Sequence, residues 1–103
     1  MNTLVSIIIP TKNNARTLAA CIQSIRMQTY HNTECIIVDN FSTDQTVSIG
    51  KRMNCAVYNH GTERCEQRNY GVSQSQGTYV ICIDADMELS PEVIESCVQK
   101  MQA

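Results

Sequence analysis

Four short apolar runs alternate along the chain with longer segments whose apolar residues recur three or four positions apart. An uninterrupted β-branched run predicts a strand covered on both faces, and the recurrent spacing predicts an amphipathic helix. The predicted strands are residues 4–9, 35–38, 55–58 and 78–83, and the predicted helices are residues 15–27, 43–53, 63–76 and 91–101. Such an alternation is typical of a parallel sheet with right-handed crossovers.

The 103 residues suffice for one domain, and we expect a single α/β domain over residues 1–103. Its predicted architecture is a doubly wound, Rossmann-like parallel sheet of strand order 3-2-1-4 with helices on both faces. In that order the first and fourth strands lie side by side at the switch point. Ligands bind beyond the carboxyl ends of such strands.

Polar residues at the ends of the predicted helices suggest how each helix begins or stops. Asn13 or Asn14 can cap the first helix, and Ser42 with Gln45 resembles a capping box for the second. Thr62 can cap the third helix, and Gly77 is expected to end it in a left-handed conformation.

Polar residues also follow three of the predicted strands. Pro10, Thr11, Lys12 and Asn13 follow the first strand, Asp39 and Asn40 the second, and Asp84 and Asp86 the fourth. Two carboxylates so close repel each other, and a hard divalent ion with oxygen ligands would relieve the repulsion. The three groups are expected to meet in one crevice. Turn and cap chemistry is the alternative explanation for each aspartate and asparagine.

Arg64 and Arg68 lie one helical turn apart in the third predicted helix and therefore share a face. They could bind an anion, face solvent, or pair with Glu63 or Glu66.

Composition limits the partners and the compartment. With 8 basic and 10 acidic residues the net charge is −2, which provides no positive electrostatic field to attract nucleic acid. The six cysteines form no C-x-x-C pair, and we interpret them as buried, reduced thiols of a cytosolic chain. No run reaches the roughly 20 apolar residues of a membrane span. We expect a cytoplasmic protein, with the inner face of the membrane as an alternative location.

Four segments in order resemble the nucleotide-binding half of the inverting family-two glycosyltransferases, which have the A-type fold. They are VSIIIPTKN at 5–13, IIVDNFSTD at 36–44, QRNYG at 67–71 and GTYVICIDAD at 77–86. The resemblance covers nearly the whole chain, and it implies a transferase that binds a nucleotide-diphospho-sugar donor, usually a UDP-sugar.

The resemblance also implies roles for single residues. Pro10, Thr11 and Asp39 match positions that contact the base and ribose, and Arg68 matches an arginine near the diphosphate. Asp84 and Asp86 match the D-x-D motif that holds Mn²⁺ or Mg²⁺ beside the leaving diphosphate. We add Asn13, Asn40 and Arg64 to the predicted nucleotide-binding set.

The chain departs from this family in length, because no residue after the D-x-D is a convincing general base for the acceptor hydroxyl. We expect a donor-binding half, either truncated or naturally short, whose acceptor is a glycan, a lipid or another hydroxyl compound. Its uncharged fourth strand would be exposed at the sheet edge and could pair with a second copy. Alternatives are a nucleotidyltransferase, a receiver-like module phosphorylated on Asp39, and a non-catalytic assembly module.

Overall fold

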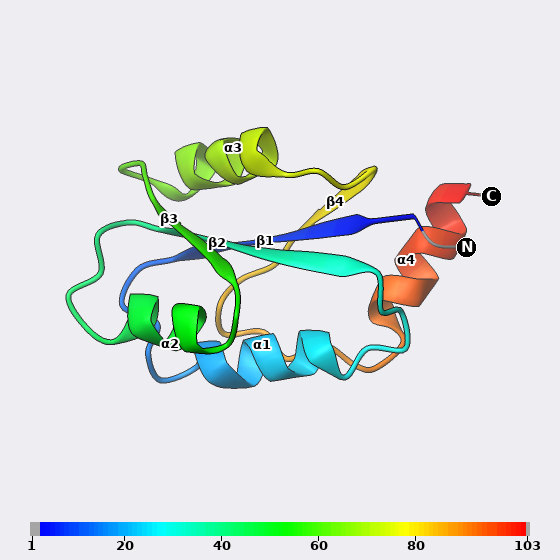
Figure 1. The fold of residues 1–103 in the computed structure, drawn as a ribbon, viewed down its shortest axis with the longest axis horizontal. Helices are drawn as coiled ribbons and strands as arrows, with labels where there is room; N and C mark the ends of the chain where they lie inside the picture. The colour runs from blue at the N-terminus through cyan, green and yellow to red at the C-terminus, as the bar shows by residue number, and fades with distance from the viewer. Residues whose placement is uncertain (1–2, 103) are drawn as a thin grey trace.

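A computed structural model describes residues 3–102, and it shows one four-stranded parallel sheet of order β3-β2-β1-β4 (Figure 1). The predicted order and fold class are confirmed. The elements in chain order are β1 (Val5–Thr11), α1 (Leu18–Arg26), β2 (Thr33–Asp39), α2 (Thr46–Arg52), β3 (Ala56–Asn59), α3 (Arg64–Gln74), β4 (Tyr79–Cys82) and α4 (Val93–Gln102). Residues 1–2 and 103 of the predicted domain lie outside the described residues.

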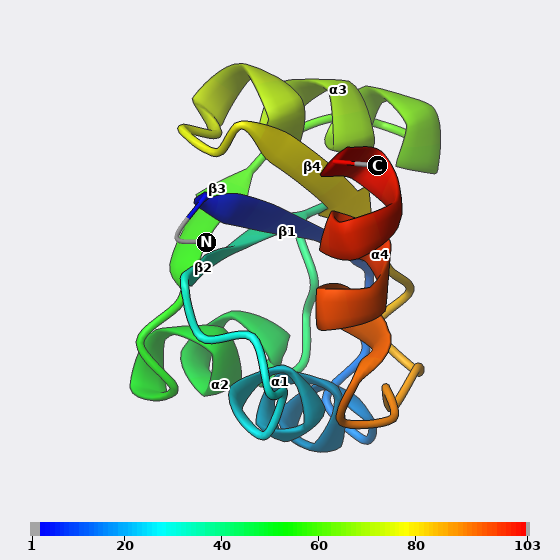
Figure 2. The same cartoon turned by 90° about the vertical axis from the view of Figure 1, so that its right-hand side faces the viewer.

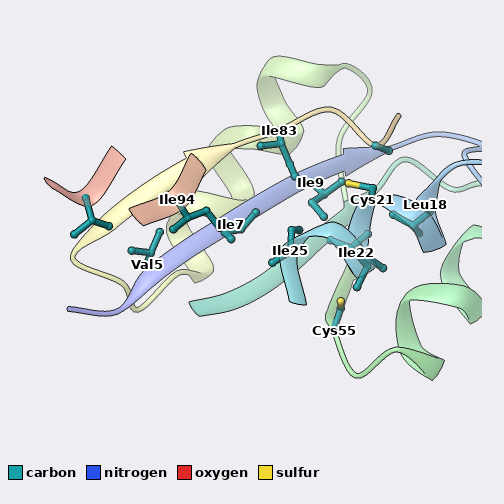
Figure 3. Close-up of a cluster of buried hydrophobic side chains, with 13 residues drawn as sticks. Val5, Ile7, Ile9, Leu18, Cys21, Ile22, Ile25, Cys55, Ile83 and Ile94 are labelled. Carbon is teal, nitrogen blue, oxygen red and sulfur yellow. The ribbon is translucent and has the colours of Figure 1, made fainter. Parts of the chain in front are cut away.

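Helices cover both faces of the sheet, with α3 on one side and α1 and α2 on the other (Figures 1 and 2). Alternate residues of β1 face opposite sides. Ile7 and Ile9 pack in the larger apolar cluster with side chains of α1 and α4, which Figure 3 shows in close-up. Ile8 packs in a smaller cluster with Ile36 and Val38 on the α3 side. All seven residues of β1 are buried, as expected for a central strand.

Pro10 does not end the first strand as predicted, because β1 continues to Thr11. The carbonyl of Ile8 accepts a hydrogen bond from the Ile83 N–H, so Ile8 and Pro10 direct their backbone groups toward β4. Pro10 has no N–H for the next bond on this side. The ladder to β4 therefore stops, and the chain beyond Cys82 leaves the sheet with Asp84 and Asp86.

The predicted side-chain caps are wrong for α1, α2 and α3. Their N-cap residues are Thr17, Gln45 and Glu63, and none makes a side-chain capping bond. Gly77 is not left-handed; helix α3 ends at Gln74 and passes through an extended Ser75. The capping prediction considered each helix alone, whereas the polar residues before α1 and α2 are hydrogen-bonded to one another.

All six cysteines are free, but the prediction that they are buried is only partly correct. Cys21 and Cys55 are buried, whereas Cys65 on α3 and Cys82 at the end of β4 are exposed. The exposure of Cys82 agrees with the predicted edge position of the fourth strand, so the burial prediction for this cysteine was inconsistent with the predicted strand order. Between residues 3 and 102 no helix is long and apolar enough to cross a membrane.

Candidate functional site

The carboxyl ends of the strands gather the predicted site residues at one edge of the sheet, on the left in Figure 1. Thr11 and Asp39 are paired in register at the ends of β1 and β2. Asp84 lies two residues beyond the end of β4, and Arg64 opens α3. The topology therefore brings polar groups from four segments to the edge where ligands bind in parallel α/β sheets.

Asp39 is fully buried, and three donors hold its carboxylate. Thr11 Oγ1 donates to Oδ1 at 2.5 Å, Ser42 Oγ donates to Oδ1 at 2.6 Å, and the Ser42 N–H donates to Oδ2 at 2.7 Å. These bonds replace the hydration that the buried carboxylate has lost, and they connect the end of β1 to the loop after β2. Contact of Asp39 with a nucleotide remains a prediction, which requires the Ser42 side of this network to open.

Asn13 and Lys12 join the loop after β1 to the loop after β2. Asn13 adopts a left-handed φ of 54°, its N–H donates to Ser42 Oγ at 2.7 Å, and its Oδ1 accepts from the Thr43 N–H at 2.8 Å. Lys12 Nζ donates to the Asn40 carbonyl at 2.8 Å. The predicted nucleotide-binding residues Asn13 and Asn40 are therefore positioned by two loops hydrogen-bonded to each other, here called the double loop, and their ligand contacts remain predictions.

Asp44 extends this double loop toward the helices. Its Oδ1 accepts from the Thr46 N–H at 2.9 Å, and its Oδ2 accepts from the Ala15 N–H at 3.1 Å. The Thr46 hydroxyl and these backbone donors lower the pKa of Asp44 below its ordinary value, because they stabilise the charged form.

Gln67 on α3 is a site-building residue that the sequence analysis did not single out. It is 4% exposed, and its Nε2 donates to the carbonyls of Val38 at 2.8 Å and Thr11 at 3.0 Å. One amide thus fixes α3 against the ends of two strands. A polar residue four positions before the buried Gly71 is the signal that could have located it on the buried face of this helix.

Arg64 and Arg68 both approach Asp84, so their predicted shared face is confirmed. Arg64 Nη1 lies 3.3 Å and Arg68 Nη2 lies 3.8 Å from Asp84 Oδ1. The side chains of Arg64, Arg68 and Asp84 are 61%, 41% and 42% exposed. Pairing with Glu63 or Glu66, the alternative interpretation, is wrong for residues 3–102. The Arg68 Nε is buried and has no hydrogen-bond partner in this part of the chain.

Asp86 is exposed in the turn that follows Asp84. The Met87 N–H donates to the Asp84 carbonyl at 3.0 Å, and the Cys21 thiol donates to the same oxygen at 3.7 Å. Burial, assisted by the charge of Asp86, raises the pKa of Cys21 to about 11, so this thiol stays protonated as a donor. The turn that carries both acids is therefore attached to α1.

The acid pair fits a metal that takes its remaining ligands from a substrate. No group of three or more His, Cys, Asp or Glu side chains in the described part of the chain could form a complete protein cage. Mg²⁺, and by similar oxygen chemistry Mn²⁺, binds through one or two carboxylates together with substrate phosphates and water. Asp84 and Asp86 would supply this carboxylate set, and their metal-binding role remains a prediction.

A family model described as glycosyl transferase family 2 matches residues 6–103. The chain belongs to this family. The match begins within β1 and includes every segment that builds the site, so the family resemblance drawn from the sequence is confirmed.

A curated glycosyltransferase and a solved structure align with most of this chain. Glycosyltransferase GlyG of Streptococcus pneumoniae is 29% identical over 109 residues, which cover 99% of this chain and 36% of GlyG. The solved S. aureus TarS 1-349 is 25% identical with a TM-score of 0.87, covering 95% of this chain and 32% of TarS. It has also been solved in complex with UDP-GlcNAc. This chain thus spans about a third of the length of these two proteins.

A mannosyltransferase from Pyrobaculum calidifontis, solved in complex with GDP-Man and Mn²⁺, is 27% identical with a TM-score of 0.71. It covers 80% of this chain, which in turn covers 27% of that protein. The fold of this chain is therefore shared by a protein solved with UDP-GlcNAc and by one solved with GDP-Man.

Proposed function

We propose that the chain is a single donor-binding domain of an inverting glycosyltransferase and that it binds a nucleotide-diphospho-sugar, most simply a UDP-sugar, with Mn²⁺ or Mg²⁺. The observation that carries the proposal is the meeting of Asp84 with Arg64 and Arg68 at the ligand-binding edge of the sheet. Two cations beside an acid pair can bind a metal-diphosphate group. The UDP-GlcNAc complex of TarS supports the choice of donor.

The residues divide into two groups by position. Pro10, Thr11 and Asp39 at the strand ends and Asn13 and Asn40 in the double loop are assigned to the base and ribose. In the segment after β4, Asp84 and Asp86 are assigned to the metal, and Arg64 and Arg68 on α3 are assigned to the diphosphate. When bound, the metal supplies Lewis-acid stabilisation of the leaving diphosphate. Both arginines add positive charge where the phosphate oxygens become more negative.

The transfer itself needs an acceptor and a base. We propose a glycan, a lipid or another hydroxyl compound as acceptor, attacked with inversion. Glu95 accepts a hydrogen bond from Thr29 Oγ1 at 2.7 Å and is therefore engaged within the domain. We place the general base outside residues 3–102 and expect little or no transfer by this domain alone.

We also propose a cytoplasmic location, which the six free cysteines support.

Calorimetric titration of UDP with and without Mn²⁺ tests the donor assignment. We expect Mn²⁺-dependent binding to the parent and at least a tenfold loss for Asp86→Ala, since a carboxylate metal ligand is removed. Glu92→Ala is the matched control, because it removes an exposed acid from the segment before α4. UDP binding that Mn²⁺ does not strengthen, or an Asp86→Ala titration identical to that of the parent, would contradict the proposal.

A phosphoacceptor role for Asp39 is disfavoured by its complete burial and its three donors. The edge position of β4 instead favours a second property, self-association. Among residues 3–102, strand β4 pairs with β1 alone, and it carries no charged residue. We propose that two copies pair through β4.

Sedimentation equilibrium of the parent and Thr78→Lys tests the pairing. A charge beside the edge should shift the equilibrium toward monomer, whereas Gln74→Lys on α3 should not. A parent that stays monomeric at every concentration would contradict self-association and leave the donor assignment untouched.

A further inference from the structure

Arg64 and Arg68 contact the very carboxylate that the proposed function gives to a metal. Both guanidinium groups point at one oxygen, Asp84 Oδ1, at 3.3 Å and 3.8 Å. A divalent cation placed at the same oxygen would lie close to two like charges, which is unfavourable at the partly exposed edge of a protein. The arginines and a metal therefore compete for Asp84.

The arginine arrangement has the features of a contact that can be exchanged. All three side chains are at least 41% exposed, and an ion pair so exposed is worth little. Arg68 also leaves its Nε buried without a hydrogen-bond partner among the described residues. A buried donor without a partner indicates that this guanidinium has not made all of its bonds in this arrangement.

Asp86 offers a contrast on the same turn. It is exposed and makes neither of the two ion pairs of the described chain. A metal arriving alone would meet one available carboxylate, Asp86, and one carboxylate held by two cations. A diphosphate would make the second carboxylate available, because its oxygens accept hydrogen bonds from both guanidinium groups in their preferred planar geometry and so free Asp84.

We infer that Arg64 and Arg68 are exchange residues: they hold Asp84 in the absence of donor and transfer to the diphosphate when the donor binds, which releases Asp84 to the metal. This inference rests on the proposed function and deepens it. It makes the binding of metal and nucleotide mutually dependent, because each ligand removes an obstacle to the other. Metal alone is bound weakly, and nucleotide prepares the second carboxylate.

A purely structural ion pair predicts the opposite change in metal affinity when one arginine is removed. If the arginines only orient Asp84, removing one of them loosens the carboxylate and weakens metal binding. If they compete with the metal, removing one of them strengthens the binding of Mn²⁺ alone and weakens the binding of UDP alone. The two single-ligand titrations therefore separate the possibilities without any measurement of activity.

The experiment measures binding of Mn²⁺ alone, followed by electron paramagnetic resonance of the free ion to millimolar concentration. Arg64→Gln and Arg68→Gln should each lower the Mn²⁺ dissociation constant by about two- to fivefold, the size expected for an exposed ion pair. In metal-free calorimetry both variants should bind UDP more weakly than the parent. Arg52→Gln, at the exposed end of α2, removes the same charge far from Asp84 and should change neither value.

Arg64→Lys provides the second comparison, since it keeps the positive charge and should keep the weak Mn²⁺ binding of the parent. Circular dichroism of each variant establishes that it is folded. Mn²⁺ binding that is unchanged, weaker or undetectable in both glutamine variants, relative to Arg52→Gln, would overturn the exchange even if the parent binds UDP with Mn²⁺. A parent that binds no UDP under any condition would instead refute the proposed function.

Discussion

Gln67 shows how much of the site depends on one buried side chain. Replacing it with methionine keeps the volume but leaves the carbonyls of Thr11 and Val38 without their side-chain donor. We expect Gln67→Met to lower the free energy of unfolding by about 1–3 kcal/mol, the cost of unsatisfied buried polar groups. Urea denaturation measures the loss, and Gln74→Met on the exposed end of α3 is the control. Equal stability of the two variants would contradict this role.

Asp44 gives the double loop a dependence on pH. Its pKa is lowered in the folded state, so its contribution to stability is present above the ordinary pKa of 3.8 and is lost as pH falls through the folded value. Asp44→Asn, which resembles the protonated acid, should be less stable than the parent at neutral pH. The difference should disappear at acidic pH below the folded pKa. Thermal unfolding between pH 2 and pH 7 tests this, and a difference that is constant with pH would contradict it.

At the residue scale, sequence reasoning identifies side chains whose role follows from their place in a single strand or helix. Asp84 and Asp86 could be identified because an apolar run ends at them, and Arg64 and Arg68 because helical spacing puts them on one face. The spacing of Gln67 and Gly71 could place Gln67 on a helix face, but its role could not be predicted, since its two acceptors belong to β1 and β2 and become neighbours only in the folded sheet. The burial of Asp39 also depends on Thr11 and Ser42 from different segments.

Between elements, Gly77 sets how closely the connection from α3 approaches β1. A Cβ at Gly77 would lie 2.7 Å from the Ser6 backbone nitrogen and 2.9 Å from the Leu4 carbonyl oxygen. At Gly50 the nearest atom, at 2.7 Å, is the flexible Cδ1 end of Ile37. Gly77→Ala should therefore destabilise the domain by about 1–3 kcal/mol.

Gly50→Ala serves as the comparison and should stay within about 1 kcal/mol of the parent, because helix propensity favours alanine and Ile37 can move. Denaturation midpoints of the two variants check the order. A smaller destabilisation by Gly77→Ala than by Gly50→Ala would contradict this expectation, because it would show that the backbone near Gly77 can shift to accommodate a Cβ.

Element type and order followed from the sequence, because apolar periodicity reflects which faces are covered. Helix starts did not. Local spacing predicts Ser42 as a cap, but its hydroxyl donates to Asp39, and Asn13 accepts from the loop before α2 instead of the first turn of α1. A local rule gives each polar side chain to its own helix, whereas a site made of two loops uses the same side chains between segments.

For the molecule as a whole, ligand binding should stabilise the entire domain. The proposed ligand residues come from the ends of β1 and β2, from α3 and from the turn after β4, so a bound donor would connect elements across the sheet. A ligand at 100 times its dissociation constant adds about 2.7 kcal/mol of stability. In a domain of about 100 residues each kcal/mol raises Tm by about 4–8 °C, so UDP with Mn²⁺ should raise Tm by roughly 10–20 °C. The shift should appear equally in far-ultraviolet circular dichroism and in tyrosine fluorescence, since the domain unfolds as one unit. With a tenfold weaker affinity, Asp86→Ala should show only about half of this shift at the same ligand concentration. A shift confined to one probe would mean that the ligand orders a single loop.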